Sequence, residues 1–246
     1  MNILIIGANS AIANAVARRY AARHCSLFLV ARNEKRLQTQ RQDLEVRGAK
    51  RVGIHVLNVL KHDKHTEAIK AGHAFFDGAD IDIALISHGS LPNQDAAETD
   101  FELAKREIDV NGLSVISLLS HLIPLFKAQG RGILAVVTSV AGDRGRQPNF
   151  IYGAAKSLVS TYLQGLRGKL LPHGIHVVDI RPGLVDSPMT AQFEKGALWS
   201  TPELVAAPIE KAIDGKRHTV YVPGYWRIIM GIVCSIPEVV FKRLKL

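Results

Sequence analysis

A tyrosine and a lysine at helical spacing are the first residues of this chain whose types suggest chemistry. Tyr152 and Lys156 lie four positions apart in a segment, 152–171, whose pattern predicts a helix, so both side chains lie on one face. A phenol titrates at about 10, too high for a base at neutral pH, and a nearby ammonium lowers that pKa. The pair therefore predicts a proton-transfer site, although an ordinary helix face has the same spacing.

Ser139 favours the chemical interpretation of this pair. It lies thirteen residues before Tyr152 and directly follows the apolar run 133–137, which predicts a strand. Ligands of open parallel sheets bind beyond the carboxyl ends of the strands. A hydroxyl at that edge could hold a substrate oxygen while Tyr152 exchanges a proton with it.

The N-terminus contains a candidate phosphate-binding loop. The apolar run 3–6 leads into Gly7, and a helix is predicted from Ala11 onward. Such a turn aims backbone N–H groups and the helix dipole at an anion, and Asn9 and Ser10 could add side-chain donors. With a single glycine, the loop by itself fits nucleotide binding and a plain strand–helix turn equally well.

The end of the second predicted strand indicates which nucleotide would bind. A carboxylate at this point would bind the ribose 2′-hydroxyl of NAD, but the chain has Ala31 and Arg32 there. A guanidinium suits a 2′-phosphate. Arg32 therefore favours NADP(H) over NAD(H), the alternative being an ordinary solvated arginine before a helix.

Apolar runs alternate with amphipathic segments along the whole chain. This alternation predicts one α/β domain over residues 1–246, a doubly wound, Rossmann-like parallel sheet with helices on both faces. Thr201 and Pro202 are typical of a helix start, and segment 187–200, which fits neither pattern, is interpreted as a substrate lid. The predicted strands are 3–6, 27–30, 52–56, 81–86, 133–137, 177–180 and 219–222, and the predicted helices are 11–23, 34–47, 63–76, 101–127, 152–171 and 202–214.

Taken together, these motifs resemble the short-chain dehydrogenase/reductase family, in its short single-domain branch. Their order and spacing agree over nearly the whole chain, although each motif is weak alone. The matching motifs are the Gly7 loop, Ser87-His88-Gly89, Asp109-Val110-Asn111, Thr138-Ser139, Tyr152-Gly153-Ala154-Ala155-Lys156 and Arg181-Pro182-Gly183.

The resemblance implies a role for each residue. Tyr152 would be the general acid in reduction and Ser139 would hold the carbonyl oxygen. Lys156 would lower the pKa of the tyrosine and bind the nicotinamide ribose, and Asn111 would keep a water in a proton relay behind it. The implied cofactor contacts are Gly7, Asn9, Ser10, Ala11, Ile12, Arg32, Asn58, Val59, Ser87, His88, Gly89, Val110, Tyr152, Lys156, Pro182, Gly183, Val185 and Ser187, with Val185 receiving the carboxamide through its backbone and Ser187 standing where the family often has Thr.

The chain departs from the family pattern at several positions. Ala11 and Ala13 stand where the family usually has glycine; alanine keeps its N–H, but the added methyl groups crowd the loop. His88 replaces the alanine of the usual Asn-Ala-Gly, and its role is open. Asn58 replaces an aspartate commonly found near adenine.

Composition limits the partners. The net charge of +9 admits nucleic acid, anionic lipid or phosphorylated ligands, but the cations are dispersed, so no nucleic-acid partner is expected. The two cysteines, Cys25 and Cys234, are too few and too far apart for a zinc site or a disulfide framework. Because no signal peptide is recognised either, we expect a reducing, cytoplasmic location. We interpret His62 and His65 as a solvated helix start and expect no metal. No uninterrupted apolar stretch is long enough to predict a transmembrane helix.

The C-terminal segment 225–246 combines an apolar helical stripe with Trp226 and a basic end at Lys242, Arg243 and Lys245. Either a subunit interface or an anionic membrane surface at the inner face of the membrane could cover the stripe. The segment and the loop after Gly7 resemble those of bacterial lipid-linked keto-sugar reductases. A dimer or tetramer is expected, since Leu158, Tyr162 and Leu166 form a stripe on a helix that often packs between subunits in the family.

The sequence therefore predicts an NADP(H)-dependent oxidoreductase that interconverts a carbonyl and an alcohol, acting on a small-molecule or lipid-linked substrate. An NADP-sensing regulator without turnover is the alternative, which would not need Tyr152, Lys156, Ser139 and Asn111 together. A nucleotide-sugar epimerase or dehydratase is a second alternative, but the 66 residues from Arg181 onward leave no room for the substrate domain of such enzymes.

Overall fold

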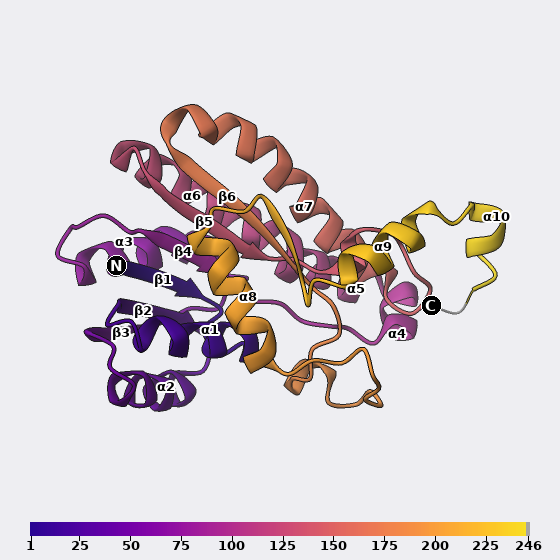
Figure 1. The fold of residues 1–246 in the computed structure, drawn as a ribbon, viewed down its shortest axis with the longest axis horizontal. Helices are drawn as coiled ribbons and strands as arrows, with labels where there is room; N and C mark the ends of the chain where they lie inside the picture. The colour runs from indigo at the N-terminus through magenta and orange to yellow at the C-terminus, as the bar shows by residue number, and fades with distance from the viewer. Residues whose placement is uncertain (245–246) are drawn as a thin grey trace.

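The computed structural model describes residues 1–244, and its architecture is a single parallel sheet between two layers of helices (Figure 1). Seven strands pair in the order β3-β2-β1-β4-β5-β6-β7, all of them parallel. The order reverses direction beside β1, as in a doubly wound fold, so the predicted fold class is confirmed. The strands are β1 (Asn2–Ile6), β2 (Ser26–Ala31), β3 (Arg51–Val56), β4 (Ile83–Ile86), β5 (Gly132–Val137), β6 (Ile175–Pro182) and β7 (Thr219–Val222).

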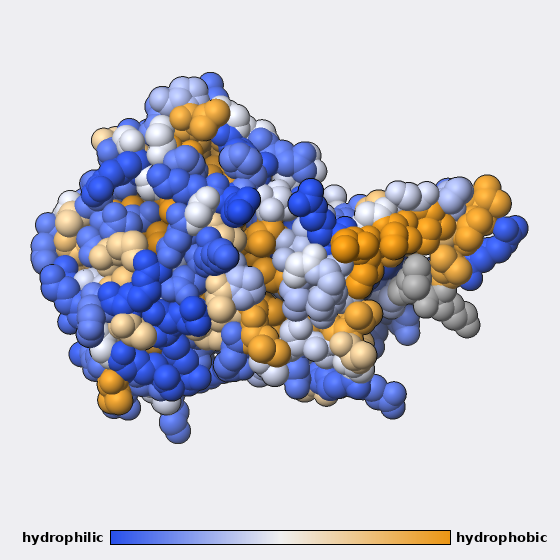
Figure 2. All heavy atoms as spheres, viewed as in Figure 1, coloured by the Kyte–Doolittle hydropathy of each residue, from blue (hydrophilic) through white to orange (hydrophobic). Residues whose placement is uncertain are grey.

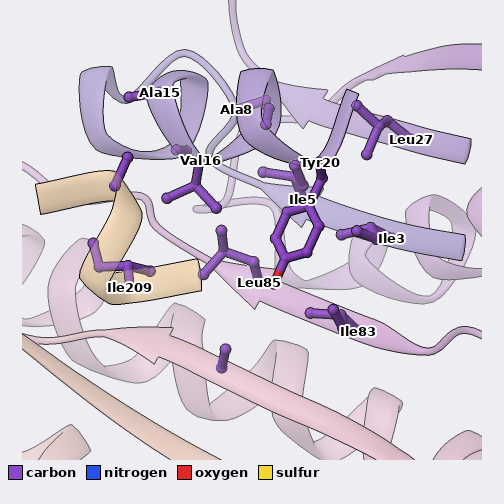
Figure 3. Close-up of a cluster of buried hydrophobic side chains, with 14 of the residues drawn as sticks. Ile3, Ile5, Ala8, Ala15, Val16, Tyr20, Leu27, Ile83, Leu85 and Ile209 are labelled. Carbon is purple, nitrogen blue, oxygen red and sulfur yellow. The ribbon is translucent and has the colours of Figure 1, made fainter. Parts of the chain in front are cut away.

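Each face of the sheet is covered by its own set of helices, because alternate residues of every strand point to opposite faces. Ile3 and Ile5 pack in one core with α1, α2 and α8, whereas Leu4 and Ile6 pack in the other with α3, α6 and α7. In Figure 3, Tyr20 and Val16 of α1 face the strands of the first core. The covering helices are α1 (Ala11–Ala21), α2 (Glu34–Val46) and α8 (Pro202–Asp214), then α3 (His65–Phe75), α6 (Ser114–Gln129) and α7 (Phe150–Leu170).

The long helix predicted over 101–127 is not a uniform α-helix. It divides into α5 (Phe101–Ile108), a π-helical turn η2 (Asp109–Leu113) and α6, and a short helix α4 (Gln94–Thr99) precedes it. By length and composition the stretch Phe101–Gln129 could cross a membrane, although the sequence predicted no such helix. Here Leu118, Leu122 and Phe126 of α6 are fully buried in the second core, so α6 serves as a core helix.

His65 corrects the interpretation of a solvated helix start. Its ring is fully buried, with Nδ1 2.9 Å from the Ser117 hydroxyl and Nε2 2.9 Å from the Val59 carbonyl. The ring thus links α3 to α6 and to the turn after β3, where Val59 is a predicted cofactor contact. Among residues 1–244, no three His, Cys, Asp or Glu side chains gather to hold a metal ion.

The C-terminal segment projects from the body as an arm made of α9 (Trp226–Ser235) and α10 (Glu238–Phe241), with Pro237 between them (Figure 1). From the sequence, Trp226 was grouped with the exposed apolar stripe. In the structure this side chain is instead buried against Val140 and Met230. The arm is held to the body by Arg144, which donates to the carbonyls of Val233 and Ile236 and pairs with Glu238. The predicted cation Lys245 lies outside the described residues.

Candidate active site

Ser139, Tyr152 and Lys156 meet at the carboxyl edge of the sheet, as predicted. Ser139 follows β5 directly, and its Oγ accepts a hydrogen bond from the Ala141 N–H. Tyr152 and Lys156 lie on the first turns of α7, and Lys156 Nζ is 5.6 Å from the centre of the Tyr152 ring. The packing of α7 against the turn after Ser139 requires Gly153, because a Cβ there would lie 2.7 Å from the Ala141 carbonyl oxygen.

The Tyr152 phenol holds its proton firmly in this environment. Burial raises its pKa to about 12, against opposing effects of hydrogen bonding with Ser139 and of the positive charge of Arg146. A protonated phenol at neutral pH suits a proton donor. The lowering of this pKa by Lys156, which the resemblance implies, stays a prediction.

Lys156 is a buried ammonium that forms no ion pair with a carboxylate of residues 1–244. It is 3% exposed, and its Nζ donates to the Val137 carbonyl at 3.3 Å. Burial lowers its pKa to about 8, which the more distant negative charge of Asp179 only partly offsets. The fold therefore holds a positive charge, at a cost in stability, at the point where the resemblance implies a nicotinamide ribose.

Asn111 lies on the π-helical turn and fixes the loop after β4. Its Oδ1 accepts from the Ser90 N–H at 3.1 Å, and its amide nitrogen is 3.3 Å from Glu107 Oε2, which in turn accepts from the Ser90 hydroxyl. A Cβ at Gly89 would lie 2.8 Å from Asn111 Oδ1 and 3.5 Å from Lys156 Nζ. The structure thus brings Asn111, Gly89 and Lys156 together, while the proton relay stays a prediction. Turns of this kind are frequent at functional sites.

Two loops touch at the start of the candidate cofactor site. Gly7 has φ +85°, and a Cβ there would lie 2.3 Å from the backbone nitrogen of His88, so no larger residue fits. Ser87 donates to the Ser10 hydroxyl at 3.2 Å. Ser10, at the N-cap of α1, makes no side-chain bond to the first turn of that helix. The N–H groups of Ala11 and Ile12 in that turn therefore have no side-chain cap, and this cradle fits a phosphate group.

Asn9, predicted as a side-chain donor to the phosphate, has a structural role in this loop as well. Its amide nitrogen donates to Gln40 Oε1 at 3.0 Å, and its Oδ1 accepts from the Asn33 N–H at 3.3 Å. These bonds tie the phosphate loop to α2. Gln40 of α2 makes a second bond to the same loop, because its amide nitrogen donates to the Ala8 carbonyl at 2.8 Å.

Arg32 is exposed at the end of β2, and a second cation, Arg36, lies on the first turn of α2. Arg36 donates to the Asn9 carbonyl at 3.3 Å and so extends over the phosphate loop. Sequence reasoning missed Arg36, although its place four residues after Arg32 puts both on one side of the helix start. Asn58, the third predicted contact of this region, uses its Oδ1 locally to accept from the Leu60 N–H.

His88 uses one ring nitrogen in a structural hydrogen bond, and the other ring nitrogen is without a partner among the described residues. Its Nε2 lies 2.8 Å from the Ser114 hydroxyl, which itself donates to the Val110 carbonyl at 2.8 Å. Since that hydroxyl proton is already used, Nε2 must carry the donated proton, and Nδ1 is then a buried acceptor with no partner among residues 1–244. Burial and the charge of Lys156 lower the pKa of His88 to about 3, so the ring is neutral.

The segment after β6 closes the other side of the site. Gly183 follows Pro182 and lies under Trp226, since a Cβ at this glycine would be 1.9 Å from the indole nitrogen. Ser187 and Thr190 cap one short turn, and the Thr190 hydroxyl donates to the Val185 carbonyl at 2.8 Å. Residues 191–198 are exposed, whereas Trp199 is half-buried and Ser200 is buried, and Tyr225 of the arm donates to the Leu198 carbonyl. Sequence reasoning had no signal that Trp226 would contact this loop.

A separate hollow of about 1540 Å³ lies between α1, α8 and β7 and contains none of these residues. Its lining includes Arg19 and Arg23, which pair with Glu210, and Arg23 also pairs with Asp214. The hollow is therefore lined largely by charged groups that pair with one another, and none of the predicted site residues faces it.

Comparison with known sequences agrees with this geometry. The profile of the family described as short chain dehydrogenase matches residues 1–197. An uncharacterized oxidoreductase of Mycobacterium tuberculosis is 31% identical over 242 residues, which cover 98% of this chain and 96% of that protein. One of Streptomyces coelicolor is 33% identical over 244 residues, which cover 99% and 95%.

Solved structures show the same fold. Levodione reductase superposes with a TM-score of 0.82 at 20% identity, covering 92% of this chain and 97% of that one. An alcohol dehydrogenase from the archaeon Thermococcus sibiricus, complexed with 5-hydroxy-NADP, superposes with a TM-score of 0.79 at 23% identity, covering 90% and 95%.

Replacing the buried lysine should stabilise the cofactor-free protein. Because the pKa of Lys156 falls from 10.5 to about 8 in the fold, the unfolded chain binds the proton more tightly between these values. The charge therefore destabilises the fold fully below about pH 8, and this effect declines as the pH rises toward 10.5. Lys156→Met should raise the free energy of unfolding at pH 7 by about 1–3 kcal/mol, and by less at pH 10.

Urea unfolding at both pH values measures this difference. Lys70→Met, which removes an exposed lysine of α3, is the matched control and should change little at either pH. A Lys156→Met variant that is less stable than the parent protein at both pH values would show that the buried charge is compensated.

Proposed function

Because this chain belongs to the short-chain dehydrogenase family and is an NAD(P)-dependent oxidoreductase acting on CH–OH groups, we propose that it uses NADP(H) and that Tyr152 is its general acid and base. The observation that carries the proposal is the meeting of Ser139, Tyr152 and Lys156 at one edge of the sheet, beside the uncapped start of α1. NADP(H) supplies or accepts the hydride when bound.

The side chains supply the proton and hold the reacting oxygen. In reduction, the Ser139 hydroxyl holds the substrate carbonyl oxygen, and the Tyr152 phenol gives its proton to that oxygen. The raised pKa of Tyr152 keeps this proton in place until the oxygen becomes basic. Lys156 then stabilises the phenolate that remains, because an ammonium in a dry site is a strong electrostatic partner.

The residues toward the cofactor fit a nucleotide with a 2′-phosphate. Backbone N–H groups at the start of α1 and the Ser10 hydroxyl would hold the pyrophosphate. Arg32 and Arg36 would hold the 2′-phosphate, and there is no carboxylate at Ala31 to repel it. Pro182, Gly183, Val185 and Ser187 would line the nicotinamide end.

Segment 187–200 would act as a lid over the substrate. It is joined to the body by one isolated bridge between Val185 and Ser200 and to the arm by the Tyr225–Leu198 hydrogen bond. For the oligomer, we propose that α6 and α7 pack against a second copy of this chain. Leu113 and Leu158 are exposed there, whereas Leu166, the last residue of the predicted stripe, is buried in this chain's own core.

Tyr152→Phe tests the proton donor. The variant should keep its fold and its affinity for NADPH, because only the hydroxyl is lost, while its turnover should fall by about 10²–10⁴. NADPH oxidation measured with a panel of ketones and aldehydes gives the rates, and fluorescence titration gives the affinity. Tyr162→Phe, on the same helix, is the control. Turnover close to that of the parent in Tyr152→Phe would exclude this tyrosine as the acid.

Arg32→Ala and Arg36→Ala test the cofactor preference. Each variant should lose roughly tenfold or more in affinity for NADPH and little for NADH, because only the 2′-phosphate contact is removed. Ala31→Asp combined with Arg32→Ala should erase or reverse the preference by repelling that phosphate. Arg41→Ala removes a cation of α2 that already pairs with Glu45 and is the control. Equal affinities of the parent for both cofactors would refute the preference.

The arm defined by residues 225–244 would hold the protein at an anionic membrane surface on the cytoplasmic side. Its exposed apolar residues are Ile228 at 69%, Ile232 at 63%, Val239 at 61% and Val240 at 49%, and Figure 2 shows them gathered along the projection. Arg227, Lys242 and Arg243 are exposed beside them. The only acidic residue of the arm, Glu238, is paired with Arg144. Apolar residues flanked by cations favour anionic headgroups over a second protein surface.

Ile228→Ser combined with Ile232→Ser should abolish binding to vesicles that contain phosphatidylglycerol. Binding of the parent should weaken at high salt and on pure phosphatidylcholine, because the cations contribute about 1 kcal/mol each near an anionic surface. Co-sedimentation measures it, and Val46→Ser with Leu204→Ser, at exposed apolar positions of α2 and α8, is the matched control. A parent protein that stays in the supernatant, together with a lower oligomer mass in the arm variant, would assign the arm to a subunit interface.

A further inference from the structure

Arg146 lies in the loop between Ser139 and α7, six residues before Tyr152. Its side chain is half-buried, and its Nε atom is buried. The positive charge of this guanidinium lowers the pKa of the Tyr152 phenol, in keeping with a place on the same side of the site. Neither the proton transfer nor the cofactor contacts described above use this residue.

The other cations around this loop are paired. Arg144 binds the carbonyls at the end of α9 and pairs with Glu238. Arg181 pairs with Asp143 and Asp179 at 2.6 and 2.7 Å, and Tyr221 donates to Asp143 as well. Asp143, the carboxylate closest in sequence to Arg146, is therefore already occupied.

Arg146 itself makes no hydrogen bond or ion pair through its side chain within residues 1–244. Its Nε is buried and has no acceptor, and burial lowers the pKa of the guanidinium. A buried N–H donor without an acceptor is unfavourable in a folded chain. Such a donor, on the loop that leads to the reacting tyrosine, suits a ligand that supplies the missing acceptor.

Further donors without partners surround the reacting pair. Gln94 accepts from the Ile151 N–H through Oε1, which leaves its buried Nε2 free beside Tyr152. Trp226 packs on Val140, next to Ser139, and its buried indole N–H is also free. Among the described residues, two buried acceptors of the site are also without a partner, Asn149 Oδ1 in the loop before α7 and His88 Nδ1 after β4. A site rich in donors suits a ligand rich in acceptors.

We propose that Arg146, on the loop before α7, and Gln94, which binds the first turn of that helix, form a subsite for an anionic group of the substrate, a carboxylate or a phosphate, whose carbonyl carbon lies elsewhere on the same molecule. The proposal rests on the function proposed above and adds the class of substrate. A guanidinium binds either anion through two parallel hydrogen bonds, so the contact would fix the orientation of the substrate as well as its charge. Held from this side, the substrate presents its carbonyl oxygen to Ser139 and Tyr152.

Three aldehydes of the same shape test the subsite in the presence of saturating NADPH. 4-Carboxybenzaldehyde and 4-formylphenyl phosphate are anionic, and methyl 4-formylbenzoate is neutral. The parent should have a higher kcat/KM for at least one anionic aldehyde than for the ester, and the larger of the two values identifies carboxylate or phosphate. Arg146→Met should lower the anionic-to-neutral ratio tenfold or more, and Arg146→Lys should retain part of it.

The ratio is the readout because any effect of Arg146 on Tyr152 changes the rate for all three aldehydes. Arg131→Met is the matched control, since this arginine precedes β5, away from the carboxyl edge of the sheet, and already pairs with Asp80 at 2.8 Å, and it should leave the ratio unchanged. An equal ratio in the parent and in Arg146→Met would overturn the subsite.

Binding separates failure of the subsite from failure of the proposed function. If the parent binds NADP⁺ but reduces none of the aldehydes, calorimetric titration of the NADP⁺-saturated protein with benzoate and with neutral benzamide still tests Arg146. Benzoate should bind the parent and lose tenfold or more in Arg146→Met, whereas benzamide should show no such difference. Equal benzoate affinity in both proteins would refute the subsite. A parent that binds neither NADP⁺ nor NADPH would refute the proposed function instead.

Discussion

Parallel pairing of the central strands is the constraint on which the site depends. β1, β4, β5 and β6 pair in one register, so their carboxyl ends form a single row. The residues that follow these strands, from Gly7 and Ser87 to Ser139 and Pro182, are therefore neighbours although they are far apart in the chain. The contact between Gly7 and His88 shows how close this row is, because the two backbones leave no space for a Cβ.

Charge compensation differs sharply between the two sides of this row. Arg181 is held by Asp143 and Asp179, so this network keeps the end of β6 in place. Lys156 is buried and Arg146 half-buried, neither forms an ion pair with a carboxylate of residues 1–244, and burial lowers the pKa of both. Holding charge in this way costs stability. Such a cost is expected at a functional site, and the partners proposed above are the phenolate of Tyr152 for Lys156 and an anionic substrate group for Arg146.

The C-terminal arm is connected to the site as well as to the surface. Trp226 covers Gly183 and touches Val140, so the first turn of α9 contacts the loops after both β5 and β6. Arg144, in the same loop as Arg146, binds the last carbonyls of α9. Any surface that binds the exposed residues of the arm would therefore lie next to the entrance for substrate, and a movement of α9 would reach Ser139 through one layer of side chains.

The sequence by itself determined the class of fold, because strands buried on both faces read as continuous apolar runs and their alternation with helices allows few arrangements. It also predicted that Tyr152, Lys156 and Ser139 would lie together at one edge of the sheet, since helical spacing and the end of a strand are local properties. Only the tertiary structure decided the rest. Asn9, predicted as a phosphate donor, also binds Gln40 on another helix, and His65 was expected in solvent, but it fills a space between α3 and α6. Trp226 contacts the loop after β6. Within residues 1–244 the Arg146 Nε has no acceptor, and Asp143, the carboxylate closest to it in sequence, is bound by Arg181 from β6. Which polar groups are paired and which are left free depends on distances between segments remote in sequence, and no local pattern encodes those distances.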